Sequence, residues 1–443
     1  MAEPHAQPIV GMPPITVGRR QALLAGLASL LGWSFDLFDL FLILYVAPTI
    51  GPLFFPSDIP TLQLAAVYAS FAVTLVMRPV GSALFGPYAD RHGRKRAMVV
   101  AVFGVGVATA LLGVLPTIAQ AGLLAPILFL ALRLVQGVFV GGVVASTHTL
   151  STETVPPHWR GLMSGLIGGG GAGVGALLAS LVFYVVSALF PGPAFSVWGW
   201  RIVFLTGILG SLLSFFVFRS VEESPFWVEL ERKRQRGTRP PLKELVSPTY
   251  RSVLLLNLLI VAGAGTQYYL TSGYLPTFLN VVNRLPGTAA GPILIAGSLV
   301  VIIATALFGA LSEAIGRKRT MLATGVVNLF VIPWAYLQLR DLREDALGAI
   351  AVYVLVLSFF GNAAYAPVLI FLNERFPTAI RASGTALSWN IGFAIGGIMP
   401  TFATGLARQV AALPISIVLF LIGAILIYLL GNAVSPETRG RFV

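Results

Sequence analysis

The chain has 443 residues, of which 56% are hydrophobic and only 10% are charged, and its mean hydropathy is +0.86. A soluble protein of this size and composition would expose one continuous apolar surface. A cytosolic enzyme, a secreted disulfide scaffold and a disordered chain are therefore excluded. The sequence contains no cysteine and carries a formal net charge of +12. We expect a multi-pass protein of the cell (inner or plasma) membrane, with the lipid bilayer as its partner.

Apolar runs of about 20 residues, the length that crosses the hydrocarbon core of a bilayer, occur twelve times. The predicted spans are 21–48, 62–87, 97–117, 123–150, 161–189, 200–219, 251–281, 289–313, 320–339, 346–371, 382–405 and 412–432. A polar segment at mid-chain divides them into two sets of six. The predicted organisation is a tail (1–20), a first half (21–220), a linker (221–250), a second half (251–432) and a second tail (433–443).

The basic residues sort to one side of these spans. Of the 29 Lys and Arg residues, 22 lie in the tails and in the loops after even-numbered spans, five lie on the opposite side, and Arg78 and Arg133 lie within spans. Cytoplasmic loops collect Lys and Arg, so both termini are expected in the cytoplasm. The positive charge then reflects topology, and no nucleic-acid partner is expected.

The two halves repeat each other in sequence. GPYADRHGRK at Gly86–Lys95 and GALSEAIGRK at Gly309–Lys318 share Gly, an acid, Gly and Arg-Lys at the same spacing. ETVPPHWRG from Glu153 and ERFPTAIRA from Glu374 share Glu, Pro and Arg. Parallel six-helix repeats are typical of transporters in which the substrate path runs between the halves. The repeat therefore favours alternating access by rocking over duplication retained for folding alone.

These motifs, together with RLVQG (Arg133–Gly137), VEESP (Val221–Pro225) and SPETRG (Ser435–Gly440), resemble the major facilitator superfamily. Within that superfamily, GWSFDLFDLFL (Gly32–Leu42) and RPVGSALFG (Arg78–Gly86) are similar to metabolite:proton and sialate/lactate:proton symporters.

The resemblance implies an all-α membrane protein of twelve transmembrane helices in two pseudo-symmetric halves. It also implies proton-coupled symport of a small organic anion, with a monocarboxylate such as lactate favoured. A sugar or another neutral solute, carried by the same fold, is the alternative. Glu usually follows the Gly-Gly pair of the fourth span in both groups, but Val143 stands there, so that proton site is lost.

Charged side chains within spans are costly and are therefore functional candidates. Asp36 and Asp39, spaced i,i+3 on one helix face, are candidates for proton coupling together with Arg133 and His148. Arg78 and Arg133 are candidates for binding a substrate carboxylate, because a guanidinium keeps its charge and matches that group. The alternatives are structural ion pairs for the charged groups and a local hydrogen bond for His148.

The second half offers uncharged candidates instead. Gln267, Tyr268, Tyr365 and Asn390 could orient a polar substrate by hydrogen bonds. The alternative is that these groups hold helices together.

The repeated loop motifs are candidates for gating. Asp90 is expected to pair with Arg94 or to cap a neighbouring helix, and Glu313 with Arg317 repeats this arrangement. The gating candidates are Gly86, Asp90, Arg91, Arg94, Glu153, Arg160, Glu313, Arg317, Glu374 and Arg381. No motif indicates covalent catalysis, metal ligation or nucleotide binding. We therefore expect a transporter rather than an enzyme, with no cofactor and no metal, acting as a monomer.

Overall fold

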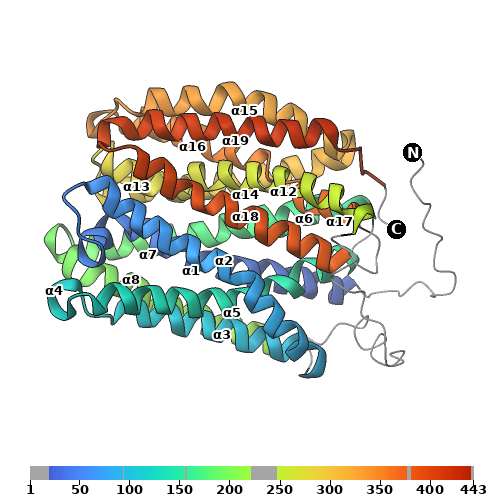
Figure 1. Ribbon diagram of the computed structural model, residues 1–443, viewed down its shortest axis with the longest axis horizontal. Helices are drawn as coiled ribbons and strands as arrows, with labels where there is room; N and C mark the ends of the chain where they lie inside the picture. The colour runs from blue at the N-terminus through green and yellow to red at the C-terminus, as the bar shows by residue number, and fades with distance from the viewer. Residues whose placement is uncertain (1–18, 93, 155–156, 221–246, 377–380, 441–443) are drawn as a thin grey trace.

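The computed structural model describes residues 19–92, 94–154, 157–220, 247–376 and 381–440. Within these ranges all regular secondary structure is helical, and the long helices run side by side (Figure 1). This is the expected solution in lipid, where a helix satisfies its own backbone hydrogen bonds.

Six spans form the N-terminal half. They are α1 (Arg19–Phe54), α2 (Pro60–His92), α3 (Arg94–Gly113), α5 (Leu124–Thr154), the run α6 (Arg160–Gly165), η2 (Leu166–Gly170) and α7 (Gly171–Leu189), and the run η3 (Phe195–Gly199), α8 (Trp200–Leu205) and α9 (Gly207–Ser220). Two short helices, α4 (Ile118–Ala121) and η1 (Pro157–Trp159), lie between them.

Six spans also form the C-terminal half. They are the run α12 (Pro248–Tyr268), η4 (Tyr269–Gly273) and α13 (Leu275–Val281), then α14 (Gly287–Ile315), α15 (Arg317–Leu339), the run η5 (Glu344–Ala346), α16 (Leu347–Ala363) and α17 (Val368–Glu374), then α18 (Arg381–Leu406), and finally η6 (Val410–Ala412) with α19 (Leu413–Val434).

Each of the twelve predicted spans coincides with one of these helices or helix runs. Within the described residues, ten helices are long and apolar enough to cross a membrane by length and composition. A further apolar helix, Val99–Gly113, is shorter. That helix belongs to α3, and α18 completes the second set of six. The predicted fold class, an all-α membrane protein of twelve transmembrane helices in two halves of six, is confirmed.

The halves meet along two seams, α7 against α14 and α2 against α18. The first seam continues through α6, where glycines allow close backbone approach. A Cβ added at Gly165 would lie 2.3 Å from the carbonyl oxygen of Thr305, and one at Gly309 would lie 2.7 Å from the carbonyl oxygen of Gly161. Small residues at such contacts are the usual way for membrane helices to pack tightly. Next to the second seam, α1 packs against α2 and η4 packs against α18.

Candidate substrate and proton site

Two opposite charges lie buried in the N-terminal half. Asp36 of α1 and Arg78 of α2 are 4% and 3% exposed, and their carboxylate and guanidinium approach to 3.6 Å. The distance is that of an ion pair and is too long for a hydrogen bond. Within the part of the chain that the structure describes, both Asp36 oxygens, and Nε and Nη2 of Arg78, have no hydrogen-bond partner. The pair therefore retains unused donors and acceptors for a third group.

Arg133 is held mainly by neutral groups. It is fully buried in α5, where its Nε donates to the carbonyl oxygen of Ser70 at 3.4 Å and its Nη1 donates to Oε1 of Gln136. Gln136 in turn donates to Oγ1 of Thr109 at 2.6 Å. Nη2 of Arg133 has no hydrogen-bond partner, although Asp39 attracts the guanidinium electrostatically. Gln136 was not predicted as a site residue from the sequence, although its place in the RLVQG motif beside Arg133 was a signal for it.

Asp39 shares a small cavity with Asp36. The lining also includes Phe35, Val105 and Ser211, and every residue that lines it belongs to the N-terminal half. Its volume of about 10 Å³ is close to the room needed by one water molecule. The two aspartates therefore share one face of α1, as their spacing predicts. That face is turned into the N-terminal half.

Aromatic rings from both halves pack at the centre. This central aromatic cluster consists of Trp33, Phe41, Phe71, Tyr268, Tyr269, Tyr365, Trp389 and Phe393. Tyr268 stacks on Tyr365 with ring centroids 5.3 Å apart, and Trp33 of α1 meets the edge of Trp389 of α18 at 5.8 Å. The cluster therefore spans the boundary between the two halves.

The cluster lies next to the buried charges. Arg78 and Asp36 each interact electrostatically with Tyr268, Tyr269 and Tyr365. The guanidinium of Arg133 lies 5.9 Å from the centroid of the Phe71 ring. Cationic and anionic side chains of one half thus adjoin aromatic side chains that are supplied largely by the other.

The four uncharged candidates of the C-terminal half have different surroundings. Nδ2 of Asn328 donates to Oε1 of Gln267 at 2.8 Å, and Nε2 of Gln267 donates to the carbonyl oxygen of Gly263, so this amide joins helices. The Tyr268 hydroxyl and Oδ1 of Asn390 are buried without a hydrogen-bond partner. Tyr268 and Tyr365 belong to the central aromatic cluster, whereas Gln267 is committed to helix packing.

A network of charges joins helix ends on the cytoplasmic side of the C-terminal half. Arg317 pairs with Glu313 at 2.6 Å and with Glu374 at 3.1 Å, and Thr438 donates to Glu374 at 2.7 Å. Glu313 also accepts a hydrogen bond at 3.0 Å from the backbone N–H of Gly161, which belongs to the first half. Glu313 therefore pairs with Arg317 and also caps a helix start across the boundary.

Arg160 lies half-buried at the start of α6. For the remaining candidates, the side chain or its surroundings lie outside the described part of the structure. These are His148, Gly86, Asp90, Arg91, Arg94, Glu153 and Arg381. Their roles in coupling and gating stay predictions.

The sequence model of the Major Facilitator Superfamily matches residues 22–400. The chain belongs to this superfamily. The inner membrane metabolite transport protein YhjE of Escherichia coli K12 is 31% identical over 375 residues, which cover 83% of this chain and 84% of that protein. The glycine betaine/proline/ectoine/pipecolic acid transporter OusA of Dickeya dadantii is 28% identical over 389 residues, covering 86% and 77%. The proline/betaine transporter of E. coli K12 is 28% identical over 390 residues, with the same coverage.

Solved structures of the superfamily share the fold. The crystal structure of a D-xylose-proton symporter superimposes with a TM-score of 0.70 at 18% identity, covering 95% of this chain and 99% of the other. A partially occluded, inward-open form of XylE from E. coli gives a TM-score of 0.70 at 19% identity, with the same coverage. This superfamily member is therefore a multi-pass membrane transporter of small solutes.

The expected substrate class finds no support in the relatives. The sequence favoured a small organic anion such as lactate, whereas OusA and the proline/betaine transporter are named for betaine, proline, ectoine and pipecolic acid. Such compounds carry a positively charged nitrogen group, an ammonium in betaine, proline and pipecolic acid, beside the carboxylate and have no net charge. A carboxylate is common to both classes, so the buried arginines alone do not distinguish them.

Proposed function

We propose that this protein is a proton-coupled symporter of small zwitterions, in which a carboxylate accompanies a quaternary or secondary ammonium group. The observation that carries the proposal is the placement of the central aromatic cluster beside the Asp36–Arg78 pair. Aromatic faces attract alkylated ammonium groups, and a guanidinium binds a carboxylate. A monocarboxylate would use only the second of these features.

The ion pair suggests how substrate and proton are coupled. Arg78 is held by Asp36 at 3.6 Å without a hydrogen bond, so a substrate carboxylate competes with Asp36 for the guanidinium. An Asp36 carboxylate that lost this partner inside the membrane would be costly to keep charged. Uptake of a proton by Asp36 removes that cost. Binding of the substrate and binding of the proton therefore favour each other.

Alternating access then proceeds by rocking of the halves about the glycine-lined seam. The Gly161–Glu313 hydrogen bond crosses the boundary on the cytoplasmic side and must break when that side opens. One such contact biases the closed state without locking it, because a hydrogen bond to a charged group contributes about 1.5–3 kcal/mol. The same network holds Glu313 ready to re-form the contact.

Uptake into proteoliposomes with an imposed pH gradient, acid outside, tests the proposal. We expect accumulation of radiolabelled glycine betaine or proline that collapses when a protonophore removes the gradient. Unlabelled lactate and xylose serve as competitors and are expected to have little effect. Uptake of betaine that is indifferent to the gradient would contradict the coupling, and strong competition by lactate or xylose would contradict the substrate class.

A further inference from the structure

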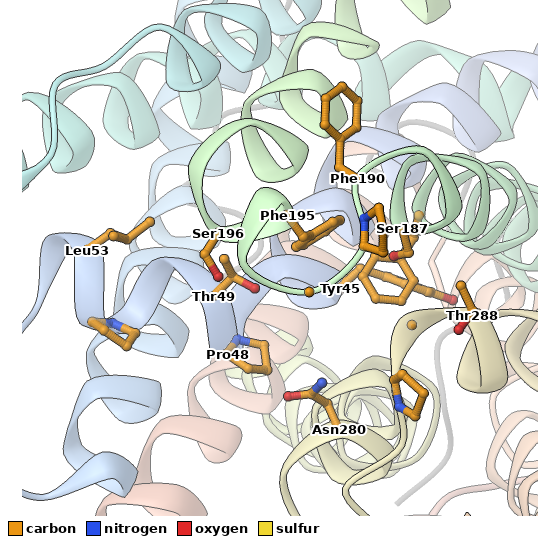
Figure 2. Close-up of a pocket in the computed structure, with 16 residues that line it drawn as sticks. Tyr45, Pro48, Thr49, Leu53, Ser187, Phe190, Phe195, Ser196, Asn280 and Thr288 are labelled. Carbon is orange, nitrogen blue, oxygen red and sulfur yellow. The ribbon is translucent and has the colours of Figure 1, made fainter.

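A second pocket lies between the two halves and extends from Tyr45, one helical turn beyond Phe41 of the central aromatic cluster, to the end of α1. Its volume is about 480 Å³, within the range of small-molecule sites. It is lined by the last turns of α1, the end of α7, η3, the end of α13 and the first turn of α14 (Figure 2). α1 starts on the cytoplasmic side, so its final turns lie at the outer face of the membrane. We call this space the outer pocket.

One wall of the outer pocket is aromatic and held in place. Tyr45 and Phe183 meet edge to face at 5.4 Å, and Phe183 and Phe195 meet edge to face at 5.7 Å. The Tyr45 hydroxyl forms a hydrogen bond of 2.5 Å with Ser180, which is itself 3.3 Å from the hydroxyl of Ser298 in the other half. Side chains fixed in this way lose little further freedom when a ligand binds, so the wall is preorganised.

The facing groups are polar but uncharged. Figure 2 shows Asn280 across the pocket from Tyr45 and Phe195, with Ser196 and Thr288 also at its rim. Every residue that lines the pocket is apolar, aromatic, hydroxyl-bearing or an amide. A ligand with a net charge would find no counter-charge in this lining, and leaving a charge uncompensated is costly. A solute that carries an alkylated ammonium group and a carboxylate finds a partner for each charge, because aromatic rings attract the first and amide and hydroxyl donors bind the second.

We propose that the outer pocket is a second binding site for net-neutral ammonium carboxylates, occupied from outside before the solute reaches the centre. The alkylated ammonium group lies on the faces of Tyr45 and Phe195, and the carboxylate accepts hydrogen bonds from the Asn280 amide and the Ser196 and Thr288 hydroxyls. This inference rests on the proposed function for its ligand class. Because both halves contribute walls, the site exists only while the outer ends keep this relative position.

The test fills the pocket without touching the centre. Ser196→Trp places an indole in the pocket, and Val197→Trp is the matched control, because Val197 is the next residue of η3, is 56% exposed and does not line the pocket. Binding of glycine betaine to the purified full-length protein is titrated calorimetrically, and the initial rate of uptake from outside is measured in proteoliposomes.

We expect two betaine molecules bound per wild-type chain and per Val197→Trp chain, and one per Ser196→Trp chain. For uptake from outside, we expect Ser196→Trp to raise KM about 5-fold, the scale of a lost cation–π contact, while kcat stays near wild type. If wild type binds a single betaine and Ser196→Trp binds it equally well, the outer pocket is not a binding site, and the proposed function still stands. Absence of betaine binding to any variant would overturn both.

A second variant guards against misfolding of the tryptophan mutant. Phe195→Leu keeps an apolar side chain and removes the aromatic face, so weaker binding of betaine at the outer pocket is expected with one strong central site retained. Two sites of unchanged affinity in Phe195→Leu would contradict the assigned role of the ring.

Discussion

The carboxylate of Asp36 and the guanidinium of Arg78 face each other at 3.6 Å in the buried interior of the first half, and no hydrogen bond joins them. Two charges in this position are held mainly by each other. A substrate carboxylate that pairs with Arg78 therefore removes the counter-charge of Asp36 and favours its protonation. This relationship links substrate binding to proton binding and underlies the first three predictions.

Asp36→Asn removes the proposed proton carrier while keeping the size of the side chain. We expect accumulation driven by a pH gradient to fall at least about 10-fold, because transport would no longer require a proton. Exchange of labelled for unlabelled betaine across the membrane should persist, since that process needs no net proton movement. The control is Asp341→Asn, an exposed residue whose partner is Arg340. Accumulation by Asp36→Asn at the wild-type level would rule out Asp36 as the carrier.

Arg78→Lys keeps the charge but loses the planar fork that binds a carboxylate through two donors. We expect the KM for betaine to rise about 10- to 100-fold, corresponding to the loss of one charge-assisted hydrogen bond of about 1.5–3 kcal/mol. Arg340→Lys, on the exposed surface, is the matched control. An unchanged KM in Arg78→Lys would place the substrate carboxylate elsewhere, with Arg133 as the next candidate.

The charge carried per transport cycle separates the two substrate classes. A zwitterion that moves with one proton carries one positive charge inward, whereas a monocarboxylate that moves with one proton carries none. An inside-negative potential of 100 mV supplies about 2.3 kcal/mol per charge, enough to raise the accumulation ratio about 50-fold. Valinomycin with a potassium gradient sets that potential in proteoliposomes. Betaine accumulation that ignores the potential would be incompatible with zwitterion–proton symport.

Gly165→Ala tests the seam about which the halves rock. The added Cβ would lie 2.3 Å from the carbonyl oxygen of Thr305. Because that oxygen belongs to a helix backbone, one of the two helices would have to shift to remove the clash. We expect overpacking to destabilise the protein by about 1–3 kcal/mol and to slow uptake. Gly423→Ala is the control, since a Cβ there meets nothing within 4 Å. Thermal unfolding in detergent and the initial rate of uptake measure the effect, and equal behaviour of the two variants would count against close packing at this seam.

Glu437, beyond the last span, gives a pH-dependent prediction. Partial burial raises the pKa of its carboxyl, but backbone N–H donors of Arg439, Arg317, Thr438 and Lys318 outweigh burial, so the pKa lies below the usual range. The carboxylate accepts from Arg317 at 2.9 Å and from Lys318 at 3.2 Å, and so caps the start of α15. A depressed pKa means that this stabilisation is present above the unfolded-state pKa and is lost as pH falls through the folded-state pKa.

Glu437→Gln should therefore weaken the cap at neutral pH. We expect hydrogen exchange at the Arg317 and Lys318 amides to speed up about 5-fold at pH 7, the scale of a lost helix cap of about 1 kcal/mol. As the pH falls below the usual Glu range and through the lowered folded-state pKa, the wild-type carboxyl becomes protonated and the difference between variant and wild type should shrink. Exposed Glu344, at the start of η5, supplies the control Glu344→Gln. A difference that persists undiminished at low pH would contradict a cap made by the charged carboxylate.

Much of the fold follows from hydropathy and charge alone. The bilayer forces each apolar run to become a helix, because backbone groups in hydrocarbon have no other partners. Arg and Lys then orient the helices, and the repeat around Glu313 and Arg317 predicts that the acid pairs with the arginine or caps a neighbouring helix. These are local or periodic features, so they can be read without knowing which helices touch.

Side-chain partnerships across helices could not be read in this way. Arg133 was an alternative partner for the aspartates, yet the direct ion pair of Asp36 is with Arg78, and Gln136 holds Arg133 through a hydrogen bond. Gln267 was a candidate for substrate contact, yet its amide is bound to Asn328 on another helix. Hydrophobic periodicity specifies that a residue is inside the protein, but not which neighbour faces it.

The sequence by itself determined the membrane topology, the duplication and the short set of charged residues within the spans, because each depends on composition along a single segment. Only the tertiary structure decided that Asp36 pairs with Arg78, that rings from both halves adjoin this pair, and that nine hydroxyl, amide and aromatic side chains from both halves line the outer pocket. The physical reason is packing. Helix rotation and crossing are set by how small residues such as Gly165 and Gly309 let backbones approach, and that fit depends on both partners at once.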